Sequence, residues 1–189
     1  MALWVGMGKM GQVLNWLPLD DARDLVAQPV YERLTSSLDG EELRTVEVAE
    51  IDVDYAAGDA LCEHYGVPWE DAANCLLISA VRGPVTFYAA CLMRPGSRSD
   101  LNGAVRRFLG ARQVKMMSRD QALELSAMEY GSITAVGLPK EWRVLVDSGF
   151  ESSRSMVMGS GLLRSKLRIS MDSFCKATGG EFVPGLTRA

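Results

Sequence analysis

Two apolar segments separated by a tight turn constrain the fold of this chain more than any other feature. Residues 75–81 read CLLISAV and residues 84–93 read PVTFYAACLM, and the Arg82-Gly83 pair between them is typical of a hairpin turn. Further strands are expected at residues 44–51, 112–117, 142–147, 155–158 and 166–169, and helices at residues 55–65 and 100–109, after Ser118 and after Ser170. Because no regular βαβ repeat connects these segments, the sequence predicts an α+β (mixed α/β) fold. One central mixed, largely antiparallel sheet would be surrounded by short helices.

The chain length of 189 residues favours one domain with an extension. We expect residues 1–40 to form a partly helical N-terminal extension, which Pro29 interrupts, and residues 41–189 to form the domain. The composition, 48% hydrophobic and 23% charged, is typical of a soluble globular protein. We find no secretory signal and no apolar run near 18 residues, so we expect a cytoplasmic protein that does not enter a membrane.

The cysteines and the single histidine indicate neither a disulfide framework nor a metal site. Cys62, Cys75, Cys91 and Cys175 form no CxxC pair, and each lies in an apolar context typical of a reduced, buried thiol. His64 comes near the end of a predicted helix that Gly66 would cap, where a histidine interacts well with the helix dipole. No sequence motif places a nucleophile beside it, so we interpret His64 as structural.

The segment from Gly6 to Gly11 matches the GxGxxG pattern of dinucleotide-binding proteins. That site needs a strand before it, a helix that opens on the third glycine and an acidic residue about 20 residues further on. Here only MALWV precedes the motif, Pro18 interrupts the segment after it, and Asp20 and Asp21 come too early. We predict that this segment binds no nucleotide.

Charge is distributed unevenly along the chain. The net charge of −4 argues against a generic nucleic-acid-binding protein. Basic residues nevertheless dominate residues 94–119, and a smaller basic group lies at residues 164–168. These groups are either solvated helix faces or a local footprint for phosphates. The second interpretation assigns nucleic-acid contacts to Arg106, Arg107, Arg112, Arg164 and Lys166.

Residues 128–139, MEYGSITAVGLP, form an unusual segment. It holds two glycines and the β-branched pair Ile133-Thr134, and no charge lies between Gly131 and Gly137. The segment is too broken for a regular helix and too apolar for a plain solvent-exposed loop. Glycine lets a backbone approach a ligand closely, so a binding loop is one explanation.

Several segments from about Val46 to Leu186 together resemble the YbaK family, also called the prolyl-tRNA-synthetase-associated or aminoacyl-tRNA editing domain. The resemblance rests on the order and spacing of its pieces, over roughly three quarters of the chain. These pieces are GDALCEHYGVPWEDAANCLLI, DLNGAVRRFLGARQVKMM, EYGSITAVGLP, VLVD and MVMGSGLLRSKLRIS.

The resemblance implies a compact domain that hydrolyses the ester between an amino acid and the 3′ end of a tRNA, with prolyl-tRNA as the expected type. It implies a catalytic role for Asn74, Gly131 and Ser132. The backbone N–H groups of Gly131 and Ser132 would stabilise the oxyanion without an ionisable side chain. It implies no cofactor and no metal ion, and its partners would be a mischarged tRNA and, in addition, a synthetase. The residues that it assigns to substrate binding are Cys75, Ile133, Thr134, Ala135, Val136, Gly137, Gly159, Ser160 and Gly161.

The chain departs from the family pattern at one position that matters for catalysis. Asn74 falls where family members carry lysine, so hydrogen bonding is kept but a positive charge is lost; Arg164 and Lys166 are the nearest replacements in sequence. A non-catalytic member that binds tRNA or an aminoacyl-adenosine-like ligand therefore stays open as an alternative. A small-molecule or partner-binding module is a third. The oligomeric state stays open as well.

Editing also has an energetic logic. A substrate that lacks one methylene group is disfavoured in a synthetase pocket by only about 1–3 kcal/mol, so a second pocket must remove the wrong product. Such a pocket would be small and apolar. Ile133, Val136 and Leu138 could form its wall, or could simply pack in the core.

Overall fold

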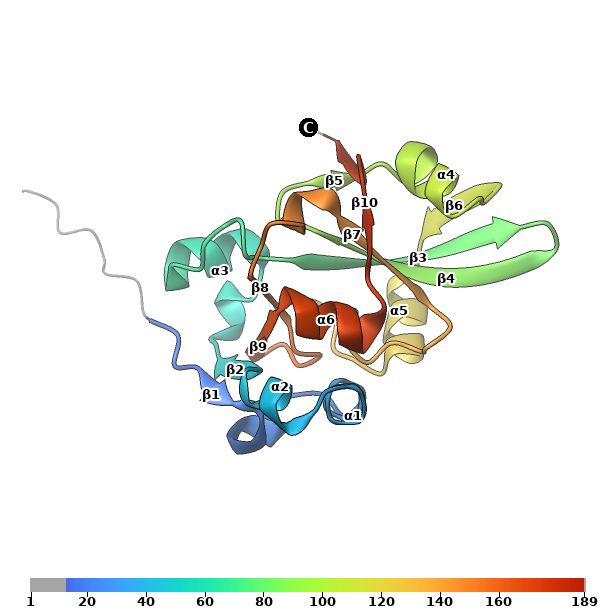
Figure 1. Cartoon of the computed structure of the whole chain (residues 1–189). Coiled ribbons are helices and arrows are strands. Elements are labelled where there is room, and N and C mark those ends of the chain that lie inside the picture. Colours follow the sequence, from blue (N-terminus) through green and yellow to red (C-terminus); the bar gives the residue numbers. More distant parts are fainter. Residues whose placement is uncertain (1–12, 189) are drawn as a thin grey trace, which may run out of the picture.

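The computed structural model describes residues 13–188, and its largest element is a five-stranded mixed sheet. The strand order is β10-β7-β4-β3-β6 (Figure 1). β7 runs parallel to β4 and β10, whereas β3 runs antiparallel to β4 and β6. The strands are β3 (Asn74–Arg82), β4 (Val85–Met93), β6 (Gln113–Met116), β7 (Arg143–Asp147) and β10 (Glu181–Val183).

A four-stranded antiparallel sheet, in the order β1-β2-β9-β8, is joined to the first sheet just before β3 begins. There the carbonyl of Val157 accepts the N–H of Ala73 at 2.8 Å, and the Val157 N–H donates to the carbonyl of Asp71 at 2.8 Å. Asn74, the first residue of β3, therefore lies at the junction of the two sheets. The remaining strands are β1 (Leu17–Pro18), β2 (Glu47–Glu50), β8 (Ser155–Gly159), β9 (Ser165–Ser170) and the separate pair β5 (Arg98–Ser99) and β11 (Thr187–Arg188).

The helices are short, and local chemistry accounts for many of their ends. α3 and α6 end at Gly66 and Gly179, which both take the left-handed conformation at φ 68° that favours glycine. The Oγ atoms of Ser118 and Ser170 accept backbone N–H groups at the starts of α5 and α6. The α-helices are α1 (Gln28–Ser37), α2 (Gly40–Arg44), α3 (Gly58–Tyr65), α4 (Arg106–Phe108), α5 (Arg119–Ser126) and α6 (Met171–Thr178). Short segments of other helix types cover Leu19–Leu25, Val53–Tyr55, Leu101–Val105 and Ser148–Phe150.

The largest hydrophobic cluster unites both sheets with α1 and α6. Leu34 of α1 and Phe174 of α6 are fully buried in it, together with residues of β4, β7, β8 and β9. Several residues between Leu19 and Leu38 belong to this cluster. Leu19 donates its N–H to the carbonyl of Val46 at 3.1 Å, and Ala27 donates to that of Ser160 at 3.1 Å. Residues before and after residue 40 therefore share this hydrophobic cluster.

The structure confirms the mixed α/β class, and it corrects three details of the predicted elements. The strands form two principal sheets and not one. The strand expected from residue 44 begins at Glu47, because α2, capped by Asp39, occupies the preceding residues. The helix expected over residues 100–109 opens as a π-helical turn, in which the Asp100 carboxylate accepts the N–H groups of Gly103 and Ala104. The GxGxxG segment lies outside the described residues.

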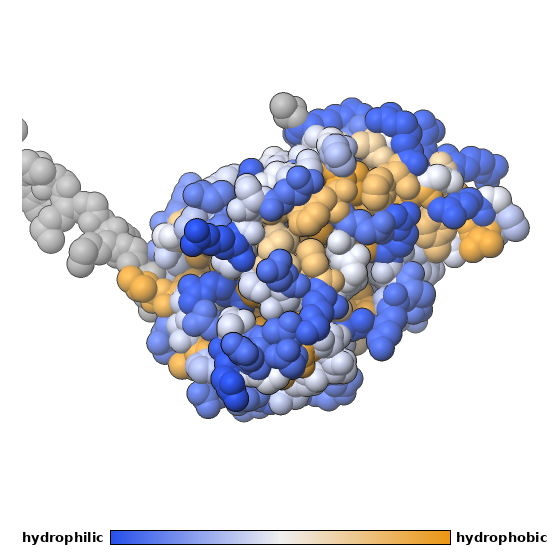
Figure 2. Space-filling view, viewed as in Figure 1, coloured by the Kyte–Doolittle hydropathy of each residue, from blue (hydrophilic) through white to orange (hydrophobic). Residues whose placement is uncertain are grey.

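The surface in Figure 2 is mostly polar, with hydrophobic side chains gathered in the region of β7 and β10 and at the tip of the β3–β4 hairpin, where Val85 is 57% exposed. Within residues 13–188, no helix has the length and apolar character that crossing a bilayer requires.

Candidate functional site

The main pocket has a volume of about 670 Å³ and lies where β3 begins. β6 pairs with Ile78–Val81 of β3, so within residues 13–188 no strand pairs with the outer edge of the first residues of β3. The pocket follows this open edge from the start of α3 to the start of α5. Asn74, Cys75 and Gly131 all line it, so the two segments that the sequence connected do meet at one site.

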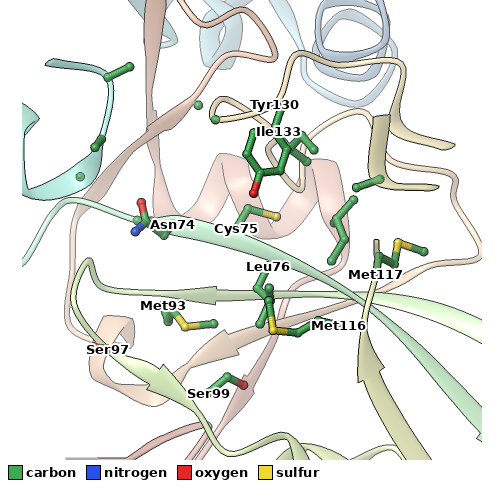
Figure 3. Close-up of a pocket in the computed structure, with 18 of the residues that line it drawn as sticks. Asn74, Cys75, Leu76, Met93, Ser97, Ser99, Met116, Met117, Tyr130 and Ile133 are labelled. Atoms are coloured by element: carbon green, nitrogen blue, oxygen red, sulfur yellow. The ribbon is translucent and has the colours of Figure 1, made fainter. Parts of the chain in front are cut away.

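The pocket has two sides because successive side chains of a strand point to opposite faces. Cys75 points to the side that holds Tyr130 and Ile133, whereas Leu76 points to the other side, towards Met93 and Met116 (Figure 3). The same division separates the two hydrophobic clusters behind the pocket, since Cys75 packs against one and Leu76 against the other. One ligand could therefore place two different groups on the two sides of β3.

The loop at residues 131–133 presents alternate residues to the pocket. Gly131 and Ile133 line the pocket, whereas Ser132 is buried behind them. The Ser132 N–H donates to the carbonyl of Glu129 at 3.1 Å, so it is not free to bind a ligand. Within residues 13–188, no hydrogen-bond partner is found for the N–H groups of Gly131 and Ile133. The Ser132 N–H is therefore engaged within the loop, unlike the N–H groups of its two neighbours.

The rest of the loop supports this arrangement from behind and does not line the pocket. Thr134 is fully buried and its hydroxyl contacts the Met158 sulfur at 3.1 Å, while Ala135 and Val136 pack in the core. Gly137 lies against the backbone of Pro29, because a Cβ there would be 2.6 Å from the Pro29 carbonyl carbon. Leu138 is also a core residue, so of the three expected wall residues only Ile133 faces the pocket.

The turn after β8 holds the loop in place. Gly159 lines the pocket, and a Cβ on it would be 2.3 Å from the Ser132 carbonyl oxygen, so only glycine permits this close approach. Gly161 donates its N–H to the same oxygen at 2.9 Å. Ser160 is fully buried, and its hydroxyl is 2.7 Å from that of Ser165. Gly159 is therefore a pocket residue, whereas Ser160 and Gly161 are structural supports.

Lys166 is the residue whose position differs most from the expectation. The sequence suggests a tRNA-facing surface position, but only 5% of Lys166 is exposed, and it lines the pocket. Its ammonium group donates to the carbonyl of Ala56 at 2.7 Å. Burial lowers its pKa from the ordinary value of 10.5 to about 8, so the group remains mostly charged at pH 7.

The other basic residues fall into two groups. Arg98 and Arg119 line the pocket, and the Arg119 guanidinium lies 4.6 Å from the centre of the Tyr130 ring. The predicted tRNA contacts Arg106, Arg107, Arg112 and Arg164 are exposed and lie outside the pocket lining. Arg164 is engaged elsewhere, because its guanidinium donates to the Asp24 carbonyl at 2.6 Å and lies 3.8 Å from the Glu50 carboxylate.

Neither Cys75 nor His64 offers an activated nucleophile to the pocket. Burial raises the pKa of the Cys75 thiol well above its ordinary value, so Cys75 stays protonated and unreactive. His64 lies outside the pocket lining and stacks on Tyr55 with ring centres 3.6 Å apart. Among residues 13–188, His, Cys, Asp and Glu side chains form no group of three that could hold a metal ion.

Residues 54–177 match the family profile described as the aminoacyl-tRNA editing domain. This chain belongs to the aminoacyl-tRNA editing domain family. Every pocket residue named above lies within the matched range. No match is found among the curated proteins.

Solved structures share the fold of this editing domain at low sequence identity. A candidate trans-editing enzyme for prolyl tRNA synthetase is 17% identical, with a TM-score of 0.69 over 86% of this chain and 99% of that chain. A hypothetical protein is also 17% identical, with a TM-score of 0.71 over 85% of this chain and 100% of that chain. A candidate signal transduction protein from Marinobacter aquaeolei VT8 is 16% identical, with a TM-score of 0.54 over 82% of this chain and 30% of that chain.

Several pocket residues of this editing domain are not evident from the sequence. Arg98 and Arg119 belong to the recognised basic stretch, but nothing local distinguishes them from its other members. Tyr130 lies within the loop segment of residues 128–139, where no sequence pattern distinguishes it. Ala57 and Gly58, at the start of α3, reach the site only through tertiary packing.

Proposed function

We propose that this editing domain is a trans-acting deacylase that hydrolyses the ester of a mischarged tRNA, with tRNA for proline as the expected partner. The observation that carries the proposal is the pocket at the open edge of β3. Asn74, Gly131, Ile133 and Lys166 all line this space of about 670 Å³. Family membership and the fold shared with a candidate trans-editing enzyme support the same reaction class.

The reaction would proceed by direct attack of water. The water oxygen adds to the ester carbonyl carbon, the bond between that carbon and the ribose oxygen breaks, and the ribose oxygen takes up the proton that water loses. Negative charge develops on the carbonyl oxygen in the transition state. The free N–H groups of Gly131 and Ile133 would stabilise that charge, and one such donor typically contributes about 10²–10³ in rate.

The two sides of the pocket suit the two parts of this substrate. The side that holds Cys75 and Ile133 is apolar and lies next to the loop donors, so it would accept the amino acid. The opposite side, with Met93, Ser97 and Met116, is open enough for the terminal adenosine, since Met116 is 62% exposed. The Arg119 guanidinium, stacked on Tyr130, would stand at the rim beside the nucleic-acid chain.

A deacylation assay with a panel of mischarged and correctly charged tRNAs tests the proposal. We expect hydrolysis above the spontaneous rate for tRNA for proline that carries a smaller amino acid, and no acceleration for correctly charged Pro-tRNA. Binding of tRNA without hydrolysis of any panel member would instead support the non-catalytic alternative, for which the asparagine at position 74 is the specific observation. If the protein neither binds nor hydrolyses any of these tRNAs, the result would favour a small-molecule or partner-binding module.

A further inference from the structure

We propose that the end of the pocket between α3 and β9 is an anion subsite. In this subsite Lys166, the start of α3 and the side chain of Asn74 bind an anionic oxygen group of the ligand. The inference rests on the proposed function in one respect, because it takes the ligand to be the aminoacylated end of a tRNA. The group is either the phosphate of the terminal nucleotide or a carboxylate on the amino acid side chain.

The first observation is the incomplete hydrogen bonding of Lys166. An ammonium group has three N–H donors, yet within residues 13–188 the Lys166 group has one hydrogen bond, to the Ala56 carbonyl. No carboxylate lies within 4 Å of it in the same part of the chain. Buried charges are normally paired, because an isolated charge is costly to remove from water. A buried, unpaired cation that lines a pocket therefore indicates an anionic ligand.

The second observation is the start of α3 at the same end of the pocket. Ala57, Gly58 and Asp59 line the pocket, and no side chain caps the helix at its N-cap residue, Ala57. The N–H of Leu61 bonds to the Ala57 carbonyl at 2.7 Å, and within residues 13–188 the N–H groups of residues 58–60 have no hydrogen-bond partner. Free N–H groups and the helix dipole together favour an anion at this position.

The third observation is the contact between α3 and β3. A Cβ on Gly58 would lie 3.1 Å from the Asn74 Oδ1 atom, so the asparagine side chain lies directly against the helix start. No hydrogen bond of the Asn74 side chain is found within residues 13–188, and its NH₂ group can donate to an anion. Lysine at position 74 would bring its charge from β3, whereas here Lys166 brings a charge from β9 into the same pocket.

Neighbouring charges define how strongly the subsite attracts an anion. Asp59 lines the pocket from the first turn of α3 and opposes an anion there. Arg98 and Arg119 line other parts of the pocket and favour one. Cys62 of α3 is another titratable neighbour, and its own pKa is raised by burial and by Asp59, so it stays neutral near pH 7. The subsite is therefore positive on balance, and Asp59→Asn should strengthen anion binding.

Calorimetric titration with two matched pairs of probes tests the subsite without requiring turnover. The first pair is adenosine 5′-monophosphate and adenosine. The second pair is the non-hydrolysable 3′-amide analogues of aspartyl-adenosine and asparaginyl-adenosine. Wild-type protein should bind the anionic member of one pair about tenfold more tightly, or better, since a hydrogen bond to a charged group contributes about 1.5–3 kcal/mol. The pair that shows the preference identifies the anion as phosphate or side-chain carboxylate.

Lys166→Met should reduce that preference to about one, whereas the matched control Arg164→Met, which removes an exposed cation two residues away, should leave it unchanged. Equal binding within both pairs by the wild-type protein would overturn the subsite, and so would a preference that survives Lys166→Met. Failure of deacylation alone would count against the proposed function and not against the subsite, because these probes measure binding.

Discussion

Replacing the buried lysine with an apolar residue should make the protein more stable at neutral pH. Lys166 is held charged in the pocket although burial lowers its pKa from 10.5 to about 8. One pKa unit corresponds to about 1.36 kcal/mol, so the charged lysine destabilises the folded state by about 3 kcal/mol at pH 7. Lys166→Met removes this penalty but leaves the Ala56 carbonyl without its donor, which costs about 1 kcal/mol. We expect the variant to be more stable than wild type by about 2 kcal/mol at pH 7.

The same pKa shift predicts how the stability difference changes with pH. Between pH 8 and pH 10.5 the unfolded chain holds the Lys166 proton more tightly than the folded protein, so the stability of the wild type rises with pH over this window. The penalty is complete below pH 8 and disappears as the pH approaches 10.5. The stability advantage of Lys166→Met should therefore shrink by about 2 kcal/mol between pH 7 and pH 9.5.

Urea unfolding of wild type and variant across this pH range, followed by circular dichroism, measures the difference directly. Arg164→Met is the control, because that side chain is exposed and its effect on stability should not change over the same pH range. A Lys166→Met variant that is less stable than wild type at pH 7, with a difference that does not vary with pH, would refute the reasoning that the buried charge is retained for binding.

Two further predictions concern the loop and the basic surface. Gly159→Ala should lower the free energy of unfolding by about 1–3 kcal/mol and reduce the deacylation rate by about 10²-fold, because its Cβ would displace the carbonyl of Ser132. Gly40→Ala is the control in both assays, because the added Cβ there meets nothing within 4 Å. Equal behaviour of the two variants would contradict the loop's role. Reversing Arg106 and Arg107 to Glu should weaken tRNA binding and flatten its salt dependence in filter-binding titrations, since each phosphate contact releases counterions. Unchanged affinity would show that tRNA does not reach α4.

Local chemistry explains the parts of the fold that the sequence predicted well. Helix ends at Gly66 and Gly179 need a residue that tolerates positive φ, and Ser170 offers a hydroxyl to a free backbone N–H. The β3–β4 hairpin results from two apolar runs and the turn at Gly83, which has a φ of 57°. Each of these signals lies within a few residues of the structure that it specifies.

Long-range pairing explains what could not be predicted. The division into two sheets depends on contacts such as Ala49 with Lys166, which are far apart in the sequence. Lysine is almost never fully buried, so its residue type and its basic neighbours suggested a surface role for Lys166. The alternation of Gly131, Ser132 and Ile133 across the pocket depends on a turn to Glu129 and on the contact with Gly159, neither of which the loop sequence specifies alone.

The most direct test of the central claim is the rate at which wild type, Gly131→Val and Asn74→Lys hydrolyse tRNA for proline that carries a smaller amino acid, after each variant is shown to be folded. Gly131 has a φ of 91°, and a Cβ there would lie 3.0 Å from the Leu163 side chain, so valine should displace the loop donors and abolish hydrolysis. Asn74→Lys should maintain or raise the rate, because it adds a further cation to the pocket beside Lys166. A folded Gly131→Val protein with full activity would contradict the assignment of this pocket as the editing site.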